Sequence, residues 1–119
     1  MSDTPYRLTQ DGPIARLTLT RPNKRNALNA AYWRDLPGCI ADLSAAGKTR
    51  VLILDAKGPH FCAGIDLGMF AGMSGSTDDA ETCEAFTDIL HRMQSGFDAL
   101  EAARFPVIAA IQGCCIGAG

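Results

Sequence analysis

Apolar and polar residues alternate along the first part of the chain, from Tyr6 to Thr20. The alternation is interrupted by Asp11-Gly12, a dipeptide that is typical of a β-hairpin turn when it separates two such runs. We therefore expect two antiparallel strands here. The next residues, from Arg21 to Asn26, are polar and include Pro22, which predicts a loop.

A helical pattern follows this loop. Asn29 can cap a helix over residues 30–46, and Gly47 can close it. Pro37 lies inside this segment and lacks the N–H that a helix interior uses, so we expect a kink or a break there.

A second, amphipathic helix is predicted to begin at Asp78 and to end before Pro106. We expect its apolar stripe to contact the core or another subunit rather than a cofactor. The stripe consists of Phe86, Ile89, Leu90, Met93, Phe97 and Leu100.

Two short runs, 51–54 and 107–111, are continuously apolar. Such runs are typical of strands that are covered on both faces. Because they alternate with helical segments, the sequence predicts an α/β fold. A short helical turn over 66–70 and a mobile loop over 72–77 are expected between the strands. The last eight residues look like a strand-to-helix turn whose helix is missing, which favours a truncated chain.

Composition narrows the function classes. The chain has 119 residues, enough for one domain, with 47% hydrophobic and 20% charged residues. Its formal net charge of -2 gives no positive field that would attract nucleic acid or an anionic membrane. We therefore expect neither as a partner, and any anionic ligand must be held locally.

The five cysteines form an odd set without a C-x-x-C spacing, which argues against both a disulfide framework and a metal site. The N-terminus lacks the pattern of a signal peptide, and no apolar run approaches the roughly 20 residues of a membrane span. A soluble protein of a reducing compartment, the cytoplasm by default, is the expectation.

Candidate chemistry lies in two segments, 61–67 and 112–119, which each follow an apolar run and are rich in Gly and Ala. A strand that leads into a helical turn leaves backbone N–H groups without partners, at the positive end of the helix dipole. An anion, or an oxygen that becomes one, is the natural ligand of such groups. Small residues let it approach the backbone closely.

Three segments, 21–29, 61–67 and 106–119, resemble in order the motifs of the enoyl-CoA hydratase/isomerase, or crotonase, family. The resemblance spans nearly the whole chain, 1–119, but only about the N-terminal half of a family core. It implies a crotonase-like spiral of ββα units with its C-terminal part missing. It also implies assembly into homotrimers or dimers of trimers.

Carried over by position, the resemblance implies that the backbone N–H groups of Ile65 and Ala118 form an oxyanion hole for a thioester enolate. The family usually has Gly at the second position, but Ala can supply the same N–H. The substrate would be a coenzyme A thioester, without a permanently bound cofactor and without a metal. Further residues implied to bind this substrate are Lys24, Arg25, Ala27, Leu28, Ala63, Gly64, Asp66, Leu67 and Gly117.

The reaction remains open between an enoyl-CoA hydratase and an enoyl- or dienoyl-CoA isomerase. The bulk of Ile65 and the segment 115–117 are similar to the dienoyl-CoA isomerase branch. The acid and base carboxylates of the family would follow Gly119, so we expect this chain to be inactive alone. Two alternatives are a non-catalytic CoA-binding or assembly protein, and a dinucleotide-binding module in which 117–119 form a G-x-G turn.

Several candidate residues also have simpler interpretations. For Asp66 we favour a loop-fixing role over a catalytic one. For Cys62 we favour a small buried residue over a thiol–imidazole pair with His60. Lys24 and Arg25 fit a solvated turn as well as a phosphate contact. Three further residues are expected to serve packing or surface roles, namely Cys114, Cys115 and His91.

Overall fold

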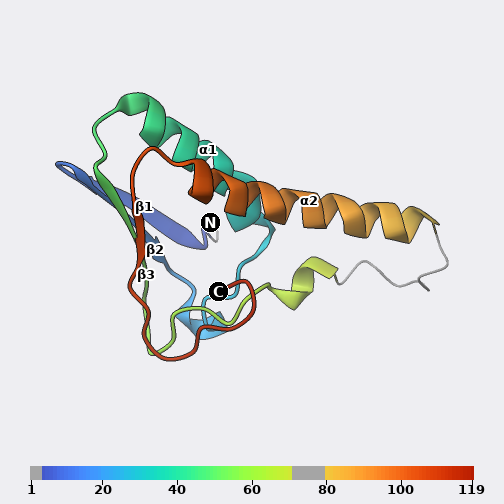
Figure 1. Ribbon diagram of the computed structural model, residues 1–119. Coiled ribbons are helices and arrows are strands. Elements are labelled where there is room, and N and C mark those ends of the chain that lie inside the picture. The colour runs from blue at the N-terminus through green and yellow to red at the C-terminus, as the bar shows by residue number, and fades with distance from the viewer. Residues whose placement is uncertain (1–3, 71–79) are drawn as a thin grey trace.

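The computed structural model describes residues 4–70 and 80–119 as a mixed sheet with two long helices (Figure 1). The strands are β1 (Tyr6–Asp11), β2 (Ile14–Leu19), β3 (Val51–Ala56) and β4 (Val107–Ala109). The helices are α1 (Ala30–Ala46) and α2 (Ala80–Ala102), with short 3-10 helices η1 (Pro22–Lys24) and η2 (Leu67–Phe70).

The sheet has the order β1-β2-β3-β4. β1 and β2 pair antiparallel, whereas β2 with β3 and β3 with β4 pair parallel. The predicted hairpin is confirmed, because Asp11 pairs with Ile14 across a turn in which Gly12 has φ 58°. Such a positive φ is readily adopted by glycine. The predicted α/β class is therefore correct.

Both predicted caps of α1 are present. The Asn29 side chain accepts a hydrogen bond from the Tyr32 N–H, and Gly47 takes a left-handed conformation with φ 71°. Of the kink or break expected at Pro37, the break is wrong, because α1 runs unbroken through this residue. An internal proline costs about 3 kcal/mol, whereas burial of one large apolar side chain contributes about 1.5–3 kcal/mol. α1 buries several such side chains, including Trp33, Leu36 and Ile40.

α1 and α2 lie on the same side of the sheet and contact each other (Figure 1). Gly96 of α2 permits this approach, since an added Cβ would lie 3.1 Å from Trp33 Cε3 and 3.3 Å from Leu36 Cδ2. The Trp33 ring packs edge to face on Phe97, with 5.3 Å between centroids. The helices and the covered sheet face therefore form one core. Its most buried members include Ala15, Leu17, Leu36, Leu52 and Cys62.

The strands predicted to be covered on both faces are less buried than expected. Only Leu52 of β3 is fully buried, and β4 ends at Ala109 rather than at residue 111. Ile108 and Ile111 are each 54% exposed. The reason is positional: β4 is an edge strand, and the two helices cover one side of the sheet. In this chain a row of apolar side chains is thus left uncovered.

The segment between β3 and α2 is partly described. The predicted helical turn is present as η2. The loop predicted over 72–77 and the predicted start of the second helix at Asp78 lie outside the described residues. The helix ends at Ala102, before Pro106 as predicted, and buries Met93 and Gly96. Phe86 and Phe97 of its apolar stripe are exposed by 43% and 45%, so the stripe is covered only in part.

Candidate functional site

The three motif segments meet at one end of the sheet, near the label of the C-terminus in Figure 1. Residues 61–66 run between the other two. On one side, the Ala63 N–H donates to the Arg25 carbonyl at 3.0 Å. On the other side, the Cys62 N–H donates to the Cys114 carbonyl at 3.1 Å, and the Ile116 N–H donates to the Cys62 carbonyl at 3.1 Å. Segments far apart in sequence are therefore joined into one backbone strip.

The orientation of Ile65 follows from its neighbours. The Leu28 N–H donates to the Gly64 carbonyl at 2.8 Å, and the Asp66 N–H donates to the Leu28 carbonyl at 2.9 Å. Successive amides of an extended segment point to opposite sides, so the Ile65 N–H is directed away from Leu28. Within residues 4–70 and 80–119 this N–H donates to no acceptor.

Ala118 lies on the adjoining segment. The Gly119 N–H donates to the Ile116 carbonyl at 2.9 Å and closes a turn in which Gly117 has φ 58°. A Cβ built on Gly64 would lie 3.6 Å from the Ala118 nitrogen and 2.8 Å from the Ile116 oxygen. The Ala118 amide thus lies beside the residue that precedes Ile65. It also donates no hydrogen bond to any part of the chain that the structure describes.

An apolar cavity of about 130 Å³ borders Ala118. It lies against Tyr32 of α1, whose pKa is raised to about 12, first by burial and then by Cys62. The phenol is therefore neutral at ordinary pH. The cavity is lined by Leu19, Leu28, Tyr32, Leu54, Phe61, Cys62, Phe97, Leu100, Ala118 and Gly119. Such a lining suits the apolar part of a ligand whose oxygen reaches an amide at the wall.

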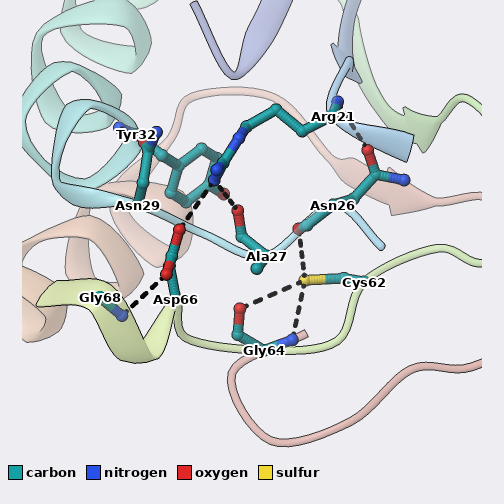
Figure 2. A network of polar contacts seen from close by, with 9 residues as sticks. All are labelled: Arg21, Asn26, Ala27, Asn29, Tyr32, Cys62, Gly64, Asp66 and Gly68. Atoms are coloured by element: carbon teal, nitrogen blue, oxygen red, sulfur yellow. Dashed lines mark hydrogen bonds and ion pairs between the residues drawn. The ribbon is translucent and has the colours of Figure 1, made fainter. Parts of the chain in front are cut away.

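Asp66 is engaged on both carboxylate oxygens (Figure 2). One oxygen accepts from the Gly68 N–H at 2.8 Å, and the other accepts from Arg21 Nη1 at 3.0 Å. These contacts lower the pKa of Asp66, the Gly68 hydrogen bond having the larger effect. An ionised carboxylate with both oxygens in use can fix the loop, which agrees with the structural role favoured for Asp66.

Asn26 is a buried residue whose role the sequence did not suggest. It is 2% exposed and has φ 55°, a conformation that asparagine tolerates better than most residues. Its Oδ1 accepts from the Arg21 N–H at 2.9 Å, and its Nδ2 donates to the carbonyls of Lys57 and His60 at 2.9 and 3.0 Å. The only sequence signal was an asparagine in a polar turn.

Cys62 is buried, as predicted, and its thiol hydrogen bonds to the Asn26 carbonyl at 3.3 Å. Burial raises the pKa of this thiol. His60 instead accepts from the Cys114 N–H through Nδ1 at 3.1 Å, so the described residues contain no thiol–imidazole contact between His60 and Cys62. Cys114 and Cys115, expected to pack, are exposed because they lie beyond the uncovered edge strand.

The other candidate binding residues are distributed around this strip. Lys24 and Arg25 are exposed at the end of η1. His91, for which we expected only a packing or surface role, is exposed on α2. Leu28 has a buried side chain, and its N–H and C=O are both used in pairing with 64–66. Leu67 is exposed at the start of η2. The structure therefore joins the backbone candidates and leaves the cations Lys24 and Arg25 at the surface.

Among residues 4–70 and 80–119, no group of three or more His, Cys, Asp or Glu side chains comes together in a way that could hold a metal ion. None of the helices in the described part is both long enough and apolar enough to span a membrane.

Known proteins similar to this chain fall in one family. The family described as Enoyl-CoA hydratase/isomerase matches residues 9–119. The mitochondrial Delta(3,5)-Delta(2,4)-dienoyl-CoA isomerase of Mus musculus is 38% identical over 109 residues, which cover 89% of this chain and 33% of that protein. The peroxisomal Delta(3,5)-Delta(2,4)-dienoyl-CoA isomerase of Arabidopsis thaliana is 34% identical, with 95% and 42% covered.

Solved structures agree. An enoyl-CoA hydratase from Bacillus anthracis superposes with a TM-score of 0.82 at 27% identity, covering 97% of this chain and 42% of that one. A proposed enoyl-CoA hydratase from Thermobifida fusca YX, solved in complex with CoA, gives 0.75 at 33% identity, with 92% and 42% covered. The chain thus spans less than half the length of these relatives.

The family match extends through 117–119, so the G-x-G interpretation of these residues as part of a dinucleotide-binding module is rejected. The mixed sheet and its helices correspond to the N-terminal part of the crotonase fold. From its sequence motifs, its fold and its relatives, this chain belongs to the enoyl-CoA hydratase/isomerase family.

Proposed function

We propose that this chain supplies the thioester-binding part of an acyl-CoA enzyme, in which the N–H groups of Ile65 and Ala118 donate to the thioester oxygen. The observation that carries the proposal is that the N–H groups of Ile65 and Ala118, which lie on adjoining segments, have no acceptor in the described part of the chain, whereas those of Cys62, Ala63 and Asp66 are paired.

The proposed chemistry requires such donors. Hydration and double-bond migration next to a thioester both place negative charge on the carbonyl oxygen, as an enolate. Fixed donors aimed at this oxygen stabilise the charge without reorganising, and one donor typically lowers the barrier by about 2.7–4 kcal/mol. The apolar cavity at Ala118 supports this role, because low polarity strengthens the interaction between an amide and an anion.

Proton transfer needs a second group. A general acid or base must have a pKa suited to the operating pH and a free oxygen within reach of the substrate. Asp66 is the carboxylate nearest to Ile65 in sequence, and both of its oxygens are occupied. Asp66 is therefore not available for this role. As the resemblance to the family implies, we propose that the acid and base carboxylates come from outside residues 1–119 and that this chain alone does not turn over substrate.

For the CoA end, we propose that Lys24 and Arg25 contact the phosphates and that the backbone at Ala27 and Leu28 contacts the adenine. Exposure of both cations at the end of η1 supports the first contact. The carbonyls of Ala27 and Leu28 each already accept one hydrogen bond. A carbonyl has two lone pairs, so each can still accept from an adenine amino group. Ala63, Gly64, Leu67 and Gly117 would line the thioester.

Among the reactions of the family, we favour 3,5-dienoyl-CoA isomerisation over hydration, because the relatives named as dienoyl-CoA isomerases are up to 38% identical. The test is to measure the turnover of 2-enoyl-CoA and 3,5-dienoyl-CoA by the full-length natural protein that carries this sequence. A higher kcat/KM for the dienoyl substrate is expected. A higher value for 2-enoyl-CoA would assign the protein to the hydratases, which act as lyases.

The second candidate is a non-catalytic CoA-binding or assembly protein, which the uncovered apolar edge at β4 favours. Binding of CoA without turnover of either substrate would support it. Assembly into trimers or dimers of trimers is also proposed, and light scattering on the full-length protein tests it. A cytoplasmic location stays a prediction; relatives from mouse and Arabidopsis are named as mitochondrial and peroxisomal, respectively.

A further inference from the structure

Arg21 carries a charge that is largely hidden from solvent. Its side chain is 11% exposed and forms an ion pair with Asp66. Arg21 Nη1 donates to two oxygens, the Asp66 carboxylate and the Ala27 carbonyl, each at 3.0 Å (Figure 2). Arginine is seldom buried unless such partners satisfy it. This side chain is therefore held inside the protein by its partners and, unlike Lys24 and Arg25, is not exposed to bind a ligand.

The two acceptors flank the contact that orients the Ile65 amide. Ala27 immediately precedes Leu28, and Asp66 immediately follows Ile65, while Leu28 and Ile65 form an isolated parallel bridge. One guanidinium thus joins the two chain segments on which the bridge lies. A second contact from Arg21 acts on the same turn, since its backbone N–H donates to Asn26 Oδ1 at 2.9 Å.

The bridge needs such support. It contains two backbone hydrogen bonds, both made by Leu28. Gly64, the residue before Ile65, has φ 97°, and glycine by itself restricts the backbone least. The direction of the Ile65 N–H therefore depends on contacts that hold the segment from outside. The Arg21–Asp66 ion pair is the nearest such contact on the C-terminal side of Ile65.

We propose that Arg21 is a positioning residue, which holds the Ile65 N–H in the direction that a thioester oxygen requires. This inference rests on the proposed function, because it assigns to Arg21 a role in that same site. A planar guanidinium can bind a carboxylate and a carbonyl at fixed angles, whereas a lysine ammonium is a flexible point charge. The proposal therefore predicts that Arg21→Lys loses part of the activity even though it keeps the positive charge.

The first experiment compares Arg21→Met and Arg21→Lys in the full-length natural protein. Misplacement of a catalytic group by about 1 Å can cost about 100-fold in rate, so we expect Arg21→Met to lower kcat by about that factor with KM little changed. Arg21→Lys should fall between Arg21→Met and the wild type. The matched control is Arg34→Met, which removes a guanidinium that is 72% exposed and pairs with its neighbour Asp35. Its kcat should be unchanged.

A second readout reports on the oxyanion directly. Acetoacetyl-CoA ionises to an enolate that absorbs in the near ultraviolet, so its titration when bound measures how well the site stabilises that anion. We expect the midpoint for the wild type to lie below that of the free ligand. Arg21→Met should move it upward. If Arg21 were needed only for folding, Arg21→Met would lower the melting temperature but leave the titration midpoint of the ligand bound to the folded protein unchanged.

A double-mutant cycle with Ile65→Pro separates the two proposals. If Arg21 acts through the Ile65 N–H, adding Arg21→Met to Ile65→Pro should cost no further activity, because residues that act as a unit are not additive. Equal midpoints for wild type and Ile65→Pro would overturn the proposed function. A different outcome would overturn only the role of Arg21. In that case the wild-type midpoint lies below that of the free ligand, Ile65→Pro raises it, and Arg21→Met leaves it unchanged. If Arg21→Met does not fold, Arg21→Lys and Asp66→Asn give the same comparison.

Discussion

Leu28 and Ile65, 37 positions apart, form a parallel bridge in which Leu28 makes both hydrogen bonds and Ile65 makes neither. Leu28 donates to the carbonyl before Ile65 and accepts from the amide after it. As a result, the N–H of Ile65, in the middle of segment 64–66, points away from Leu28. This arrangement uses the backbone N–H of Ile65 and not its side chain. A substitution that removes the N–H should therefore affect activity more than one that only shortens the side chain.

We predict that Ile65→Pro lowers kcat of the full-length protein strongly, whereas Ile65→Val does not. Proline removes the N–H, and loss of one oxyanion donor typically costs 10²–10³ in kcat, or about 2.7–4 kcal/mol. Valine retains the N–H and removes one methylene. Steady-state kinetics on the preferred acyl-CoA gives the comparison.

The Ile65 N–H has no acceptor in the described part of the chain, so proline deletes no internal hydrogen bond there. Circular dichroism and melting temperature should confirm that both variants are folded. Equal kcat values for the two folded variants would show that this amide does not bind the oxyanion.

The parts of the fold that were predicted correctly depend on short sequence signals. Asp11-Gly12 specified the hairpin, and Asn29 with Gly47 specified both ends of α1. The helix is not broken at Pro37, because burial of the apolar face of α1 outweighs the loss of one N–H. The exposure of Ile108 could not be predicted from β4 itself, since it depends on what lies beyond the edge of the sheet.

The candidate site was only partly accessible from sequence. Motif order indicated which segments carry backbone donors, and the structure places those segments side by side. The contacts that hold these segments in place could not be predicted from the sequence, because they are long-range. Asn26 bonds to carbonyls 31 and 34 positions away, and Arg21 bonds to a carboxylate 45 positions away. No local pattern encodes such pairs.

Asn26 gives a prediction about stability. Asn26→Asp should lower the free energy of unfolding by at least about 2 kcal/mol, because the carbonyls of Lys57 and His60 would lose their donor and face a carboxylate. Urea unfolding of the full-length protein measures this change. An Asn26→Asp variant as stable as the wild type would show that the two hydrogen bonds contribute nothing.

Two further variants separate the hydrogen bonds of Asn26 from its backbone conformation. Asn26→Gly and Asn26→Ala both lose the side-chain amide, but only alanine carries a Cβ at φ 55°. That conformation costs a residue with a Cβ about 1–2 kcal/mol. We therefore expect Asn26→Gly to be the more stable of the two, and the reverse order would contradict the assigned φ.

A matched pair of helix glycines tests the packing of α1 on α2. Gly38→Ala should raise the free energy of unfolding by about 0.5–1 kcal/mol, because alanine is the better helix former and a Cβ there meets nothing within 4 Å. Gly96→Ala gains the same propensity, but its Cβ would lie 3.1 Å from the Trp33 ring. Overpacking of this kind costs about 1–3 kcal/mol, so this variant should be the less stable one. If both variants were equally stabilised, α2 would not pack on Trp33 as described.

Asp66 makes stability depend on pH in a defined direction. Hydrogen bonding from Gly68, and then pairing with Arg21, lowers the pKa of its carboxyl in the folded state below that of the unfolded chain, about 3.9. A lowered folded pKa contributes stability that is fully present above the unfolded pKa and is lost as pH falls through the folded pKa. The stability difference between wild type and Asp66→Asn should therefore be constant above about pH 5 and shrink below it.

Urea midpoints of both proteins between about pH 3 and pH 7 would measure this difference across the titration of the carboxyl. Asparagine keeps an oxygen that can accept from the Gly68 N–H, so the comparison isolates the charge that faces Arg21. Arg21→Met should show the same convergence with the wild type in acid, because it removes the other half of the ion pair. A difference that persists or grows toward pH 3 would mean that the folded protein does not favour the ionised carboxylate, and the loop would then be held by other contacts.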